Sequence, residues 1–205
     1  MPKGSKELTQ ARREEIINAC EKLYQTMSFK DITIKEIGNV TSFTRTSIYN
    51  YFQTKEEIFL ALFEKEYIRW NEELEDIRGE EDELSKEELS DRIATSLARR
   101  EQLLKLLSMN NYDMEANSRP ELLTSFKRAY GKSIENIELI LEKFCPDMSS
   151  SDIKSFIYIF FPFMFGIYPY AVVTDKQRNA MKEAEVDFVY QSIYNITRSC
   201  IMNIL

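Results

Sequence analysis

The side chains best suited to chemistry lie close together near the start of the chain, between positions 44 and 51. If this segment is helical, Thr46 and Asn50 share one face, and Arg45 lies in the first turn. Such side chains donate and accept hydrogen bonds as base edges require. The segment contains no acid, and Lys35 and Lys55 flank it, which suits a phosphate backbone. An ordinary amphipathic helix with a polar outer face gives the same pattern.

Several catalytic and metal-binding functions are excluded by the residue types and motifs that the chain lacks. Its 205 residues include no His, which removes Ser-His and Cys-His catalysis and imidazole metal ligands. Cys20, Cys145 and Cys200 lie more than fifty residues apart and form no local zinc motif. We therefore expect a protein that is not an enzyme and that needs neither a metal ion nor a cofactor.

Charge is unevenly distributed along the chain. Residues 1–55 carry nine Lys or Arg and six Asp or Glu, whereas the overall net charge is −7. Local charge steers association, so a polyanion is expected to meet this first segment. The start, MPKGSKELTQ, lacks the apolar core of a secretion signal, which favours the cytoplasm.

Apolar residues recur at helical spacing almost throughout, which predicts an all-α fold. Capping boxes, in which a hydroxyl and an acid three residues later satisfy free amides, mark helix starts at Thr33, Thr54, Ser85 and Ser149. The predicted helices are 9–27, 33–40, 44–52, 54–77, 85–108, 120–144, 151–173 and 182–205. We place a domain boundary after residue 55, between a three-helix domain (1–55) and a helical body (56–205).

Two short helices joined by a tight turn predict a helix-turn-helix, whose second helix enters the major groove of DNA. The stretch ITIKEIGNVTSFTRTSIYNYFQTKEEIFLALFEKE resembles the DNA-binding domain of the tetracycline-repressor (TetR) family of transcriptional regulators. The resemblance covers about residues 10–65 and implies an N-terminal helix-turn-helix domain and a C-terminal helical ligand-binding and dimerisation domain. The matching features are Phe29, Thr33, Ile37, Gly38, Phe43, the Ile48-Tyr49-x-Tyr51-Phe52 run, and Lys55 followed by Glu56.

The resemblance also implies roles for individual residues. Three side chains would contact base edges: Arg45, Thr46 and Asn50. Two would be partial readers or phosphate contacts: Tyr49 and Lys35. Three would hold phosphates: Ser47, Tyr51 and Lys55. The predicted DNA-binding set is completed at the starts of the two short helices by Thr33 and Thr44.

The turn of this motif departs from the family pattern. Ser42 stands where the family usually has Gly, and Thr41 where it usually has Ala. A residue with a side chain that is forced to positive φ costs about 1 kcal/mol. We therefore expect the turn before the third helix to be altered or strained.

A second candidate site lies in the twenty uncharged residues 155–174, which include eight aromatic side chains, Pro162 and Pro169. Twenty residues is the minimum for a membrane span, but two prolines and several hydroxyl groups argue against one, and we expect no membrane partner. Plain core packing and the lining of an apolar ligand pocket both remain open, and they are compatible. The pocket hypothesis names Tyr112, Phe126, Tyr130, Phe161, Phe165 and Tyr168.

The resemblance, taken together with these patterns, implies a homodimeric repressor that binds a palindromic double-stranded DNA operator. A wide apolar stripe along residues 186–204 predicts packing on a second subunit, which would place two recognition helices about 34–36 Å apart. The resemblance also implies that a small apolar or aromatic effector would tilt the long fourth helix and release DNA. The alternative is a DNA-binding protein of the same fold that acts through a protein partner without a small ligand, with the eleven acids of residues 72–91 as the partner surface.

Overall fold

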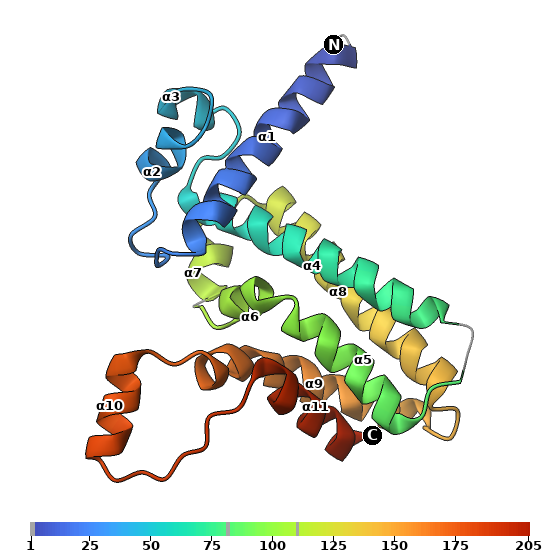
Figure 1. Ribbon diagram of the computed structural model, residues 1–205. Helices are drawn as coiled ribbons and strands as arrows, with labels where there is room; N and C mark the ends of the chain where they lie inside the picture. Colours follow the sequence, from blue (N-terminus) through green and yellow to red (C-terminus); the bar gives the residue numbers. More distant parts are fainter. Residues whose placement is uncertain (1–2, 81–82, 110) are drawn as a thin grey trace. The chain divides into compact units, whose positions relative to one another are not determined.

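The computed structural model describes residues 3–80, 83–109 and 111–205. These residues form helices and connecting loops, and none of them lies in a strand (Figure 1). The predicted all-α fold is confirmed. Glu81 and Asp82, which belong to the predicted acidic surface, lie outside the described residues.

The chain divides into two compact units. Unit 1 comprises residues 1–65 and 110–128, and unit 2 comprises residues 66–109 and 129–205. Two helices, α4 (Lys55–Gly79) and α8 (Pro120–Phe144), belong partly to each unit. The division within α4 follows Lys65, and the first turns of α4 pack against α1 through the Tyr24 and Phe59 rings, whose centroids are 5.2 Å apart. The domain boundary after residue 55 stays a prediction.

Unit 1 is built on the first helices of the chain. It contains α1 (Lys3–Tyr24), α2 (Ile34–Asn39), α3 (Arg45–Ile48) and α7 (Asn111–Ala116), with the first parts of α4 and α8. Fully buried apolar side chains from all of α1 to α4 meet in its core: Ile16, Cys20, Ile37, Ile48, Phe52 and Phe59. Each contributes roughly 1.5–3 kcal/mol by leaving water, so the short α2 and α3 are held by packing rather than by their own length.

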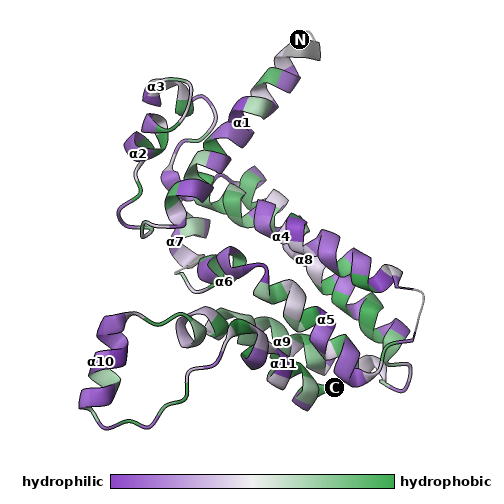
Figure 2. Ribbon diagram, in the orientation of Figure 1, coloured by the Kyte–Doolittle hydropathy of each residue, from purple (hydrophilic) through white to green (hydrophobic). Residues whose placement is uncertain are grey.

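Unit 2 contains the remaining helices, α5 (Lys86–Ala98), α6 (Glu101–Leu107), α9 (Ser150–Ala171), α10 (Asp175–Glu183) and α11 (Ile193–Ile204), with the rest of α4 and α8. α11 packs against α5 and α9, and α6 packs against α9. Trp70 is fully buried and donates its indole N–H to the Ser96 hydroxyl at 3.0 Å. α9 is mainly hydrophobic whereas α10 is mainly hydrophilic and buries no residue (Figure 2).

Several predicted helix bounds are wrong. α1 begins at Lys3, earlier than predicted, and the α-helix predicted over 44–52 is confined to Arg45–Ile48, followed by turns. The single helix predicted over 85–108 is two helices, because Arg100 leaves the helical backbone with φ −107° and ψ 43°. Its guanidinium donates to Glu73 at 2.7 Å, and the break lets four leucines of α6 face the core.

The end of the chain also differs from the prediction of one helix over 182–205. A capping box of Thr174 with Gln177 starts α10, and this signal was missed because Gln replaces the acid. Glu185, with φ 53°, lies just past the end of α10. Ser192 then caps α11 by accepting a hydrogen bond from the Asn195 amide at 3.1 Å. The short α7 was also missed.

By length and composition alone, α9 would also qualify as a membrane span. Within unit 2 one side of α9 is packed, with buried Phe156, Phe160 and Met164. Pro162 and Pro169 both lie inside the helix and are exposed. A core helix in a soluble protein passes the same length and composition test.

Candidate nucleic-acid interface

The α2–α3 pair forms a compact helix-turn-helix. Thr33 caps α2 by accepting a hydrogen bond from the Glu36 amide at 3.3 Å, and Ile37 and Ile48 anchor the two helices in the core. A Cβ atom added to Gly38 would lie 3.3 Å from the Cα and Cβ atoms of Arg45. Gly38 therefore lets α2 and α3 approach closely, which explains the need for the smallest residue there.

Ser42 in the turn is bound by Glu15 of α1. The Ser42 amide donates to one carboxylate oxygen of Glu15, and its hydroxyl donates to the other at 3.0 Å. These hydrogen bonds lower the pKa of Glu15, the backbone amide of Ser42 being the largest cause. Thr41 donates its hydroxyl to the carbonyls of Gly38 and Phe43 at 3.1 Å each.

The expected strain in this turn is absent. Among the described residues, only Glu185 combines a side chain with positive φ, so Ser42 occupies ordinary backbone conformation. The prediction assumed that a position usually occupied by Gly requires left-handed backbone. Here the Glu15 carboxylate from α1 accepts the hydrogen bonds of the Ser42 amide and hydroxyl and so stabilises the turn.

The outer face of α3 carries most of the predicted DNA contacts. Five of the predicted residues on and beside it are exposed: Thr44, Arg45, Thr46, Tyr49 and Asn50. Arg45 donates to the Tyr49 hydroxyl at 3.4 Å, and Thr44 and Ser47 share a hydrogen bond of 3.1 Å. Thr33 and Lys35 on α2 are also exposed, whereas Ser47 and Tyr51 are half-buried. An acid-free, exposed face rich in donors is therefore present in unit 1.

Lys55 makes contacts within the protein. Its ammonium donates to the carbonyls of Phe29 at 2.9 Å and Ile32 at 3.4 Å, and it lies 4.1 Å from the centroid of the Phe29 ring. These bonds hold the link between α1 and α2. The predicted phosphate contact of Lys55 stays a prediction, and the side chain has a structural role that the sequence did not indicate.

Two arginines of α1 support the motif and were missed. The Arg12 guanidinium lies 5.0 Å from the centroid of the Phe43 ring, and that of Arg13 lies 4.6 Å from that of Phe52. Arg13 also donates to the Tyr51 carbonyl at 3.4 Å. Burial lowers the pKa of Arg13, with the nearby charge of Arg119 as a second cause. Helical spacing indicated only that both side chains lie outside the apolar stripe of α1.

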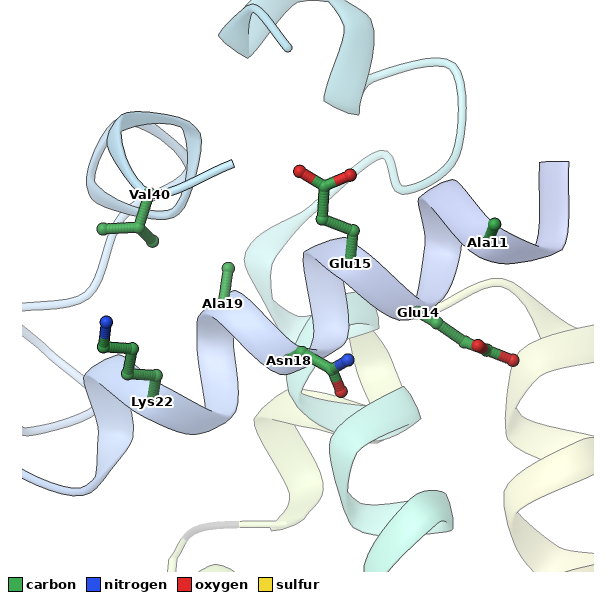
Figure 3. A pocket seen from close by; sticks show the side chains of 7 residues that line it. All are labelled: Ala11, Glu14, Glu15, Asn18, Ala19, Lys22 and Val40. Carbon is green, nitrogen blue, oxygen red and sulfur yellow. The ribbon is translucent and has the colours of Figure 1, made fainter. Parts of the chain in front are cut away.

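A hollow of about 380 Å³ lies along α1 beside α2. Figure 3 shows Lys22 pointing toward Val40 across this hollow and Glu15 on the same side of α1; Glu15 is the carboxylate that binds Ser42. The lining residues are Ala11, Glu14, Glu15, Asn18, Ala19, Lys22 and Val40. Its two carboxylates would repel a phosphate backbone, so the hollow is not part of the acid-free face.

The predicted ligand-binding aromatics are divided between the two units. In unit 1, Tyr112 is 85% exposed, whereas Phe126 is buried and its ring centroid is 4.8 Å from that of Phe63. In unit 2, Tyr130 and Phe161 meet edge to face at 5.7 Å. The six residues were predicted to line one pocket. Among the predicted residues that belong to unit 2, Tyr130 and Phe161 are the one pair whose rings are in contact in the described part of the chain.

The aromatic cluster of unit 2 extends beyond that pair. Trp70 lies 6.2 Å from Phe161, and Tyr67 lies 5.6 Å from Tyr130, measured between ring centroids. Burial raises the pKa of Tyr130 and of the half-buried Tyr168. Phe165 is 43% exposed on α9. We call the four rings of Tyr67, Trp70, Tyr130 and Phe161 the aromatic cluster.

Comparison with known proteins agrees with this geometry. Residues 16–62 match the family of bacterial regulatory proteins described as the tetR family, and residues 64–190 match the tetracyclin repressor-like C-terminal domain. The second match alone covers more than half of the chain. The chain belongs to the TetR family. It is therefore a transcriptional regulator with a DNA-binding helix-turn-helix domain, and not an enzyme.

The relatives found are distant from this TetR-family chain. The HTH-type transcriptional regulator YfiR of Bacillus subtilis (strain 168), itself uncharacterized, is 32% identical over 63 residues, which is 31% of each chain. The fatty acid degradation regulator FadR from Bacillus halodurans has a TM-score of 0.60 at 14% identity, over 95% of this chain and 94% of that one.

Two further solved structures share the TetR fold. A TetR transcriptional regulator from Rhodococcus sp. RHA1 has a TM-score of 0.57 at 13% identity and covers 96% of both chains. FadR from Bacillus subtilis, in complex with stearoyl-CoA, has a TM-score of 0.57 at 16% identity, over 93% of this chain and 96% of that one. At such identities the comparison establishes the fold and leaves the ligand open.

Proposed function

We propose that this TetR-family regulator is a homodimeric repressor that binds a two-fold symmetric DNA operator through α3 and is released from it by a small apolar effector. The observation that carries the proposal is the exposed, acid-free face of α3, with Arg45, Thr46 and Asn50 outward and Ile48 fixed in the core. Arg can address guanine with two hydrogen bonds and Asn can address adenine in the same way.

A second subunit is the proposed occupant of the outer face of α9. Tyr158 is 80% exposed there, and Ile159, Phe165 and Tyr170 are also exposed. Apolar surface of this kind is stabilised when it leaves water, and α3 alone reads only a few base pairs. Sedimentation velocity of the free protein at micromolar concentration should give the mass of a dimer. A monomer at every concentration would contradict this part.

The proposed effector binds near the aromatic cluster of unit 2. The FadR structure in complex with stearoyl-CoA makes a long-chain acyl-CoA the first compound to test. Trp70, the one tryptophan of the chain, belongs to the cluster, so its fluorescence reports binding. α4 continues from unit 1 into unit 2, and a ligand that favours one tilt of α4 would lower DNA affinity. Equal ligand affinity for free and DNA-bound protein would contradict the coupling.

The DNA-binding part is tested by selection from a random duplex library with purified protein at physiological salt. We expect an enriched inverted repeat whose half-sites lie about one helical turn, or a multiple of it, apart. A single half-site would contradict the dimer, and an unenriched pool from folded protein would contradict sequence-specific binding. Release of the selected duplex by stearoyl-CoA would then support the proposed effector. Failure of apolar compounds to release it would favour the protein-partner alternative.

A further inference from the structure

One arginine outside the predicted DNA-binding domain reaches the end of the recognition helix. Arg119 lies between α7 and α8, just before Pro120, and belongs to unit 1 although its sequence position is far from α3. One of its terminal nitrogens, Nη2, donates to the carbonyl oxygen of Tyr51 at 3.1 Å. Arg13 donates to the same carbonyl from α1 at 3.4 Å. The backbone just after α3 is therefore bound by two guanidinium groups.

A buried carboxylate fixes the position of Arg119. Glu57, in the first turn of α4, is 1% exposed. Its Oε1 accepts from the backbone N–H of Arg119 at 3.2 Å and from Nε at 2.7 Å, while its Oε2 accepts from Nη2 at 3.0 Å. The Gln53 amide also donates to Oε2, at 2.7 Å. Two parallel donors from a planar guanidinium define an orientation that a lysine cannot reproduce.

Both partners are charged in the folded protein. Burial raises the pKa of Glu57. The hydrogen bonds from the side chain and backbone of Arg119 and from the Gln53 amide lower that pKa by more than burial raises it, so the net shift is downward. The same contact with Glu57 raises the pKa of Arg119. One further bond adds to this junction, from the Thr54 hydroxyl to the Asn117 carbonyl at 2.9 Å. Residues 51–57 are thus joined to residues 117–119 by several independent bonds.

α3 depends on such anchoring because it makes few stabilising contacts through its own side chains. It is four residues long, and Ile48 is its one buried residue. The orientation of its outer face depends on Ile48, on the turn before it, which Glu15 binds, and on the backbone that follows, at Tyr51 and Phe52. We propose that Arg119 is a positioning residue for sequence recognition: it fixes the orientation of α3 through Tyr51 and Glu57 without touching DNA. The proposal rests on the proposed function, operator binding by α3.

The occupied donors of Arg119 distinguish this role from a phosphate contact. Its Nε and Nη2 bond to protein, and its Nη1 lies 3.6 Å from Glu121. A phosphate contact would lower affinity for all DNA and flatten the salt dependence by about one unit of slope. A misaligned α3 would instead lower affinity for the operator alone, since phosphate contacts tolerate small changes that base contacts do not.

The experiment measures binding of Arg119→Ala and wild type to the selected operator and to a random duplex, over a range of salt. We expect operator affinity to fall by at least about fivefold, the effect of losing a single base contact. Affinity for the random duplex and the salt slope should be unchanged. Lys127→Ala is the matched control, because Lys127 pairs with Glu115 on the surface of the same unit at 2.6 Å. It should leave the ratio of operator to random affinity unchanged.

Two conservative variants keep the test decisive if Arg119→Ala does not fold. Arg119→Lys keeps the charge and loses the planar donors, and Glu57→Gln keeps the shape and loses the charge. Both should lower the ratio while circular dichroism shows folded protein. An unchanged ratio in the folded variants would overturn the proposal, and so would a parallel fall on random DNA with a flatter salt slope. If the wild-type protein itself selects no operator, the proposed function fails, which is a separate result.

Discussion

Replacing Ser42 with glycine is expected to destabilise the protein, although glycine is the usual residue of the family in this turn. The Ser42 backbone is not left-handed, so glycine relieves no strain there. The substitution removes the hydroxyl that donates to Glu15 at 3.0 Å and frees the unfolded chain. Both effects act in the same direction, which gives the prediction a definite sign.

The size of this effect follows from the two contributions. An exposed hydrogen bond to a carboxylate is worth about 1 kcal/mol. Exchange of a side-chain residue for glycine costs about 0.4–1 kcal/mol through the entropy of the unfolded chain. The free energy of unfolding should therefore fall by about 1–2 kcal/mol, which lowers the urea midpoint by roughly 0.5–1 M for a slope of about 2 kcal/mol/M.

Urea unfolding at neutral pH, followed by circular dichroism, measures the effect. Ser42→Ala is the control, because it removes the hydroxyl and keeps the Cβ atom, and it should show about half of the loss. A Ser42→Gly protein with the same midpoint as wild type, or a higher one, would refute the reasoning and restore the interpretation of a strained turn.

The bond between Ser42 and Glu15 also predicts a pH dependence. The pKa of Glu15 is lowered from its ordinary value of 4.5, first by the Ser42 amide and then by the Ser42 hydroxyl. A depressed pKa in the folded state stabilises the protein at neutral pH, and the stabilisation is lost as the pH falls below 4.5 and through the folded pKa. The difference between wild type and Ser42→Ala should therefore shrink in acid. A difference that grows in acid would be inconsistent with this contact.

Three further predictions concern other positions. Lys55→Ala removes the hydrogen bonds to two carbonyls before α2 and should lower the free energy of unfolding, measured in urea, by about 1–2 kcal/mol. Unchanged stability would contradict the structural role of Lys55 and leave the predicted phosphate contact as its one role. Gly38→Ala brings a Cβ atom to 3.3 Å from Arg45, which should push α3 away from α2 and weaken operator binding by about 1 kcal/mol, as measured by fluorescence anisotropy. Wild-type affinity in this variant would mean that the spacing of α2 and α3 does not affect DNA binding. Cys20 is fully buried whereas Cys200 is partly exposed, so at pH 8 an aromatic disulfide reagent should modify Cys200 first and Cys20 only on unfolding; equal rates would contradict the burial.

The sequence contained enough local information to predict the helix-turn-helix. Thr33 caps its own helix through the Glu36 amide three residues on, and the burial of Ile48 could be predicted from apolar spacing alone, although the side chains that cover it come from other helices. The start of α8 at Pro120 was predicted for the same reason, because proline suits the first turn of a helix. The all-α fold followed from the repetition of such local patterns.

The contacts between distant segments could not be predicted. Arg119 and Glu57 lie 62 positions apart, and Glu57 was interpreted as the acid of a capping box with Thr54. Its amide does bond to the Thr54 hydroxyl at 3.1 Å, but its carboxylate turns to Arg119. Glu15 and Ser42 are separated by 27 positions, and spacing within one helix says nothing about a partner across a fold. The predicted ligand-binding residues stay a prediction, and the ring contact between Tyr130 and Phe161 could not be predicted, because aromatic composition does not determine which rings meet.

The central claim, that the outer face of α3 reads bases, is tested most directly by a double-mutant cycle between Arg45 and the selected operator. Affinities are measured for wild type and Arg45→Ala on the operator and on duplexes changed one base pair at a time. We predict a coupling of about 1–3 kcal/mol at one position in each half-site and none elsewhere. A loss of equal size on every duplex, random DNA included, would contradict base reading by α3.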